Sequence, residues 1–206
     1  MEYAPDGSLR DLLDKNPDTP LPKDTQLDYI KQLCHGMKYL HDMNIAHRDF
    51  KSLNVFVNGG KMKIGDFGMS RSTDVGATSV AAGATTAIAD SSYGTAGWSA
   101  PETFQEKKNV DPYKADAYAL GVVIWEVATK EFPFKGVARN AIIGTVGFGD
   151  QRPGKPEDSP IPQVQQAIAA CWKKHPSERK TPSQLLDILD GKEEAGAAGS
   201  FLSSLF

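Results

Sequence analysis

The sequence predicts a mainly α-helical domain that carries one small β-hairpin. Residues 24–41 repeat apolar side chains at helical spacing, which is typical of an amphipathic helix. Residues 115–129 are apolar nearly all round, and such a helix belongs in the middle of a fold. Two short β runs, 55–57 and 61–64, flank Asn58-Gly59-Gly60, a turn that requires positive φ. They predict the hairpin.

The other elements follow from local signals along the chain. Residues 1–6 look like an extended strand end leading into a turn. Further helices are expected at 8–15, 138–146 and 164–172, and a last one opens at Thr181-Pro182-Ser183-Gln184 with capping-box spacing. Prolines predict loops at 16–23 and 151–162. The Gly/Ala/Ser-rich segment 191–206 is expected to be a disordered tail.

Composition narrows the classes of function. The chain has 206 residues, enough for one domain or one large lobe, and its net charge of -3 indicates neither a nucleic-acid nor an anionic-membrane surface. Cys34 and Cys171 lie far apart, which argues against a disulfide framework or zinc site and favours a reducing, cytoplasmic environment. No apolar run approaches a membrane span, and the N-terminus has no signal-peptide pattern.

Three motifs carry the chemistry. They are His47-Arg48-Asp49-Phe50-Lys51-Ser52-Leu53-Asn54, then Asp66-Phe67-Gly68 just after the hairpin, then Ala100-Pro101-Glu102. In this order and context they resemble the catalytic loop, the metal-binding motif and the end of the activation segment of eukaryotic-type protein kinases. The resemblance covers residues 1–190. It implies the C-terminal lobe of that fold, a helical bundle with a small β-hairpin carrying the active site, a hinge in 1–8 and an activation segment in 66–102.

The resemblance implies a role for each catalytic residue. Asp49 would orient the attacking hydroxyl and accept its proton, and Thr95 would bond Asp49 and Lys51. Lys51 would place a positive charge on the γ-phosphate. Asn54 and Asp66 would hold Mg²⁺ beside the phosphates of ATP, because Mg²⁺ prefers hard oxygen ligands. Taken singly, each of these side chains is more often a surface or turn residue; the spacing of the whole set favours the catalytic interpretation.

The start of the chain resembles the kinase hinge. Met1 would be the gatekeeper, and the Glu2 carbonyl and Ala4 N–H would bond the adenine edge. Ser8 would lie near the ribose. Phe56 stands where the family usually has leucine beneath the adenine, so the space for the base is narrower. The alternative is a simple loop that opens a short helix.

Other residues are expected to support this site. Asp116 would accept backbone N–H bonds from the catalytic loop, Glu102 and Arg179 would form a buried ion pair, and His47 would pack rather than act as a base. Arg48 implies control by phosphorylation of the activation segment; the alternative is a merely flexible polar loop. The candidate acceptors are Ser72, Thr73, Thr85, Thr86, Ser91, Ser92 and Tyr93.

Two sets of residues bear on whether the kinase would phosphorylate serine and threonine or tyrosine. Lys51 and Gly94-Thr95 follow the serine/threonine pattern, whereas Trp98, Trp125-Glu126 and Gln151-Arg152-Pro153 resemble tyrosine kinases. That mixture is typical of the tyrosine kinase-like group of serine/threonine kinases. Serine and threonine hydroxyls of proteins are therefore the expected acceptors, and dual specificity for tyrosine as well is the alternative.

No Gly-rich phosphate loop, V-A-I-K lysine or partner glutamate precedes the hinge. We expect that the N-terminal lobe is missing from these residues and that they have little or no activity alone. The alternative is a non-catalytic, truncated kinase that acts as a binding or regulatory module. A small-molecule phosphotransferase is a further alternative. The complete GTxxWxAPE segment at 94–102 argues against it, because the resemblance implies that this segment docks protein substrates.

Overall fold

The computed structural model describes residues 5–66, 71–72, 95–105 and 110–192, with only the backbone at 71–72. Met1, Glu2 and Ala4 lie outside the described residues. So do Phe67, the side chains of the candidate phosphate acceptors, and the tail 193–206.

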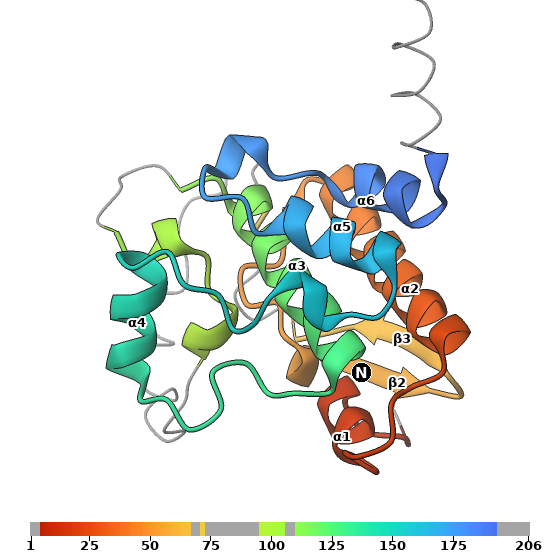
Figure 1. Ribbon diagram of the computed structural model, residues 1–206. Coiled ribbons are helices and arrows are strands. Elements are labelled where there is room, and N and C mark those ends of the chain that lie inside the picture. The colour runs from red at the N-terminus through yellow and green to blue at the C-terminus, as the bar shows by residue number, and fades with distance from the viewer. Residues whose placement is uncertain (1–4, 67–70, 73–94, 106–109, 193–206) are drawn as a thin grey trace, which may run out of the picture.

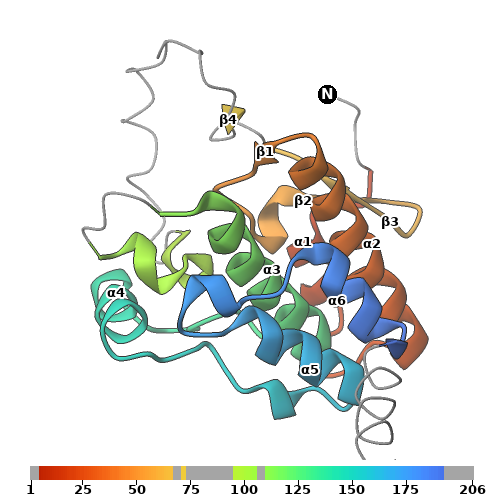
Figure 2. The same cartoon turned by 90° about the horizontal axis from the view of Figure 1, so that it is seen from above.

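Helix α3 is the central element of the fold (Figure 1). Helices α2, α5 and α6 lie on one side of it, and α4 lies on the other side in both views (Figures 1 and 2). The hairpin of β2 and β3 lies at one end, beside α1. The helices are α1 Leu9–Asp14, α2 Lys23–Asp42, α3 Pro112–Thr129, α4 Arg139–Gly147, α5 Pro162–Cys171 and α6 Pro182–Leu189. The strands are β1 Ile45–Ala46, β2 Val55–Asn58, β3 Lys61–Ile64 and β4 Arg71–Ser72, and short 3₁₀ helices cover Ser52–Asn54, Thr95–Trp98, Pro101–Thr103, Pro156–Asp158 and Pro176–Glu178.

The predicted helices and the hairpin are confirmed, with small differences at their ends. Helix α3 begins at Pro112 rather than at 115, because the Asp111 side chain accepts the N–H groups of Tyr113 and Lys114. The capping box at Thr181 and Gln184 opens α6 as expected. Sequence reasoning missed the two-residue pairing of β1 with β4, which is too short to show a periodic pattern.

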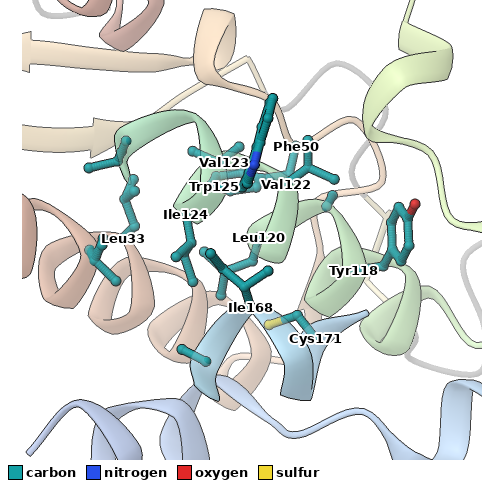
Figure 3. Close-up of a cluster of buried hydrophobic side chains, with 14 of the residues drawn as sticks. Leu33, Phe50, Tyr118, Leu120, Val122, Val123, Ile124, Trp125, Ile168 and Cys171 are labelled. Carbon is teal, nitrogen blue, oxygen red and sulfur yellow. The ribbon is translucent and has the colours of Figure 1, made fainter. Parts of the chain in front are cut away.

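The core gathers around α3. Leu120 and Ile124 of this helix lie beside Leu33 of α2 and Ile168 of α5 and are fully buried (Figure 3). A Cβ added to Gly121 would lie 2.4 Å from the Cβ of Cys171. Glycine therefore allows the close approach of α3 and α5, in keeping with the dense packing of protein interiors.

The hairpin is tied to the segment that leads into α1. Residue pairs run from Val55 with Ile64 to Asn58 with Lys61, and the turn glycines have φ of +55° and +76°. The Gly59 N–H donates to the Asp6 carboxylate (2.8 Å), and the Val57 N–H donates to the Gly7 carbonyl (2.9 Å). These bonds hold β2 against the predicted hinge side of the domain.

Within the described ranges, no helix is both long and apolar enough to cross a membrane. Cys34 and Cys171 are free and buried, and burial raises the pKa of the Cys171 thiol to about 12. Neither thiol is therefore an activated nucleophile.

Candidate active site

The catalytic loop, residues 47–54, joins β1 to β2 and is shaped by Asp116. This carboxylate is 1% exposed, at the N-terminal part of α3. It accepts the N–H of His47 (2.7 Å) and the N–H of Arg48 (2.8 Å), as expected from the sequence. Arg48 has φ of +68°, an uncommon conformation for a side chain of its size. The two bonds to Asp116 stabilise that turn and so fix the start of the loop.

Four predicted catalytic residues lie together at the loop. The Asp49 carboxylate accepts a hydrogen bond from Lys51 Nζ (2.8 Å) and one from the Asn54 amide nitrogen (3.2 Å), which also donates to the Asp49 carbonyl (2.8 Å). Lys51 Nζ donates as well to Thr95 Oγ1 (3.2 Å). The side chains of Asp49 and Lys51 are 20% and 18% exposed, so a substrate could reach both.

Asp66 follows a backbone that is anchored to the same loop. The Gly65 N–H donates to the Asn54 carbonyl (2.9 Å), and His47 Nε2 lies 3.0 Å from the Gly65 carbonyl oxygen. Asp66 itself is exposed and has φ of +58°. His47 is fully buried with its ring edge-on to Phe50, at 5.6 Å between centroids, which agrees with the expected packing role.

The oxygen ligands at this site suit a magnesium ion. Because its amide nitrogen donates to Asp49, the side-chain oxygen of Asn54 is the atom that could bind a cation. Asp66 would add a carboxylate. In the part of the chain that the structure describes, no cluster of three or more His, Cys, Asp or Glu side chains could hold a metal. Mg²⁺ needs fewer protein ligands, since it keeps waters and binds nucleotide phosphates. The residue types of Asn54 and Asp66 therefore fit this ion, and their joint binding of it stays a prediction.

On the nucleotide side, the described residues are Ser8 and Phe56. The Ser8 hydroxyl and N–H both donate to the Asp11 carboxylate (2.7 and 2.8 Å), which caps α1 and holds the pKa of Asp11 below its usual range. This capping role was not foreseen, and the predicted contact of Ser8 with ribose stays a prediction. The Phe56 ring packs against Gly65, where an added Cβ would lie 2.7 Å from it. Its place beneath adenine also stays a prediction.

The predicted acceptor side consists of the helix Thr95–Trp98 and the segment that follows it. Arg179 donates to both oxygens of Glu102 (2.6 and 2.8 Å), and both residues are at most 4% exposed, so the expected ion pair is confirmed. A cavity of about 130 Å³ lies between this side and the catalytic loop, lined by Asp49, Thr95 and nine other residues including Asp116. Asp49 and Thr95 thus face a shared space.

Two sets of contacts that connect the catalytic loop with other segments were not predicted from the sequence. His41 Nε2 lies 3.1 Å from the Asp116 carboxylate. Glu126 is fully buried, and its carboxylate accepts bonds from Arg10 Nη1 (3.0 Å), Ser52 Oγ (2.8 Å) and Trp98 Nε1 (2.7 Å). These contacts join residues up to 116 positions apart, so no local pattern could have indicated them.

Because Glu126 is buried, we expect the free energy of unfolding to depend on pH. Burial raises its pKa from 4.5 to about 7, against the lowering effects of its hydrogen bonds and of Arg10. Between these values the folded chain keeps a proton that the unfolded chain releases, so the contribution of Glu126 to stability is largest below pH 4.5 and is lost as pH rises to about 7. We expect wild type to lose roughly 2–3 kcal/mol more than Glu126→Gln over this range, measured by urea unfolding. Parallel pH profiles of the two proteins would contradict the assignment.

Known proteins that are similar to this chain include protein kinases. "Probable serine/threonine-protein kinase drkB" of Dictyostelium discoideum is 34% identical over 201 residues, covering 95% of this chain and 26% of the relative. "Serine/threonine/tyrosine-protein kinase HT1" of Arabidopsis thaliana is 32% identical over 206 residues, covering 98% of this chain and 49% of the relative. The chain thus spans half or less of the length of these two relatives.

A family model described as "Protein tyrosine and serine/threonine kinase" matches residues 1–189. The match runs through the catalytic loop and through every helix of the described fold. The chain therefore belongs to the family of protein tyrosine and serine/threonine kinases.

Proposed function

We propose that this chain is the acceptor-binding, catalytic lobe of an ATP-dependent protein serine/threonine kinase. The cluster of Asp49, Lys51, Asn54 and Thr95 supports the proposal most directly. It joins a carboxylate, an ammonium group, an amide and a hydroxyl, and two of these residues, Asp49 and Thr95, line a common cavity. The tyrosine kinase-like group is the finer assignment that the mixed sequence signals favour.

In the proposed reaction, a protein hydroxyl attacks the γ-phosphorus of ATP and the bond to the β-phosphate oxygen breaks. Asp49 orients the hydroxyl and accepts its proton, while ADP leaves with the electron pair of the broken bond. Lys51, held between Asp49 and Thr95, lies where positive charge would stabilise the transferred group. When bound, Mg²⁺ supplies charge neutralisation at the phosphates. Asn54 and Asp66 are the residues that would hold it.

The nucleotide side of the proposal rests on the first residues of the chain. The hinge would present Glu2 and Ala4 to adenine, with Met1 as gatekeeper, and Phe56 would form an apolar floor. The bonds of Asp6 and Gly7 to the hairpin would keep that floor in register with the hinge. In this proposal the kinase lobe comprises residues 1–190, and the activation segment within it comprises residues 66–102.

The catalytic proposal is tested by phosphate transfer from labelled ATP and magnesium to a peptide library. In the complete gene product we expect transfer to serine or threonine, and a loss of about a thousand-fold in Asp49→Asn. Chelation of magnesium should abolish transfer as well. Unchanged transfer in Asp49→Asn would contradict the role of this residue, and transfer to tyrosine alone would contradict the acceptor class.

The 206 residues alone are the second sample in this assay. They contain no Gly-rich loop and no lysine for the α- and β-phosphates, so water would reach the site and weaken its electrostatic effects. We expect little or no transfer from them. Robust transfer that Asp49→Asn abolishes would show that these residues suffice. An inactive complete product would favour the binding or regulatory module instead.

A further inference from the structure

Glu126 occupies a position where three separate parts of the active lobe meet. It lies one turn before the end of α3 and is fully buried. Its Oε1 atom accepts bonds from Arg10 of α1 and from Ser52 of the catalytic loop, and its Oε2 atom accepts the indole N–H of Trp98. Each donor belongs to a different segment of the chain.

Two of these donors adjoin the reacting groups. Ser52 directly follows Lys51, and Trp98 ends the 3₁₀ helix that Thr95 begins. The catalytic loop and the acceptor side are therefore connected twice. One connection is the partly exposed bond of Lys51 to Thr95 (3.2 Å), and the other runs through the buried carboxylate of Glu126.

The chemistry at Glu126 requires an acceptor with two oxygens. Arg10 and Trp98 can only donate hydrogen bonds, and they approach different oxygens of the carboxylate. A glutamine has the same size, but its NH₂ group would face a donor at Arg10 or at Trp98. Leaving a buried donor unpaired costs about 1–3 kcal/mol, which corresponds to roughly a 5- to 150-fold shift in a local opening equilibrium.

The remaining charges around Glu126 stabilise this arrangement. Arg10 is 3% exposed and donates also to the carbonyls of Lys130 (2.8 Å) and Glu131 (3.2 Å) at the end of α3, and to Asp14 (2.9 Å). Lys130 in turn donates to the carbonyls of the loop after α1. The guanidinium is thus fixed on the α3 end, and it neutralises Glu126 from the side of α1.

We propose that Glu126 is a positioning residue for phosphoryl transfer, whose ionised carboxylate sets the distance between the catalytic loop and the acceptor side. The catalytic relevance rests on the proposed function. The structural linkage does not, and the experiment below measures the linkage without phosphate transfer.

The experiment is amide hydrogen exchange near pH 8 on the wild-type chain and on Glu126→Gln. Two amides report on the linked segments: Asn54, bonded to the Lys51 carbonyl (2.9 Å), and Ser99, bonded to the Ala96 carbonyl (3.3 Å). Two distant amides serve as references: Gln165 at the start of α5 and Asp190 after α6. In Glu126→Gln we expect Asn54 and Ser99 to exchange about ten-fold faster or more, with the references within about two-fold.

Indole resonances give a second, spectroscopic readout. Trp98 donates to Glu126, whereas Trp125 donates to Asp158 (3.0 Å), so the two signals respond to different carboxylates. Glu126→Gln should move the Trp98 signal and leave Trp125 in place. Asp158→Asn should do the reverse. Glu131→Gln, a change at an exposed glutamate five positions along the chain, should move neither signal.

Each outcome decides the proposal. Equal acceleration at all four amides would mean that Glu126 serves global stability only, and no acceleration at Asn54 and Ser99 would mean that it links nothing; both overturn the proposal. Should Glu126→Gln fail to fold, Trp98→Phe removes one donor and keeps the carboxylate. Selective acceleration at Ser99 in that variant supports the linkage, and its absence refutes it.

Discussion

Replacing Arg179 with methionine is expected to lower the free energy of unfolding by about 3–5 kcal/mol. Arg179 is 1% exposed and donates to both oxygens of Glu102, and also to the carbonyls of Lys173 and Lys114 (3.0 Å each). Its guanidinium lies 5.2 Å from the centre of the Tyr118 ring. Methionine would fill much of the volume but would leave the Glu102 carboxylate buried without its partner.

Urea unfolding measures this effect, and Lys192→Met is the matched control. Lys192 also pairs with a carboxylate, that of Asp190 at 3.1 Å, but its side chain is 64% exposed. Water screens such a pair, so the control should cost less than about 1 kcal/mol. If the two variants lost similar stability, the pair of Arg179 and Glu102 would not be the anchor between the acceptor side and the helices after it.

Replacing Asp116 with alanine is the second large change, and we expect a loss of about 3 kcal/mol. The substitution leaves the buried N–H of His47 and the partly buried N–H of Arg48 without their acceptor, and an unpaired buried donor costs about 1–3 kcal/mol. The positive φ of Arg48 would then lack its stabilising bond. The amide of Arg48 should exchange far faster than in the wild-type chain.

A control for Asp116 lies five residues earlier in the same helix end. Asp111 caps α3 by accepting the N–H of Tyr113 (2.9 Å), and it is exposed. Asp111→Ala should cost about 1 kcal/mol, as other helix caps do, without changing exchange at Arg48. If Asp111→Ala and Asp116→Ala gave equal losses in unfolding experiments, Asp116 would be a helix-end charge and no more.

Much of the fold could be predicted because its signals are local. The capping box at Thr181, the glycine turn at Gly59-Gly60 and the apolar periodicity of α2 each act within a few residues. The pairing of β1 with β4 could not be predicted, since two residues carry no period. The start of α3 was placed late because its cap, Asp111, lies outside the apolar run that signals the helix.

The candidate site also has contacts that could be predicted from short spacing and contacts that could not. Asp49, Lys51 and Asn54 stand within six residues of one another, so their spacing alone indicates that they meet. Thr95 is far from them in the sequence, and the fold brings it to Lys51. The motif that contains Thr95 had indicated this contact. The contacts of Arg10 and His41 with buried carboxylates could not be predicted from the sequence, because an arginine or a histidine on an amphipathic helix is usually a surface residue. Their partners, Glu126 and Asp116, both come from α3.

Residue type and short spacing are enough to indicate the long helices, the hairpin, the order of the motifs and the class of chemistry that they suggest. Which buried charges meet depends instead on the tertiary structure. Asp116 acts on the catalytic loop from 68 and 69 positions away, and Glu126 acts on Ser52 from 74. The physical reason is that a buried carboxylate is stable only where several donors converge on it, and that convergence exists only after α3 has packed at the centre of the lobe.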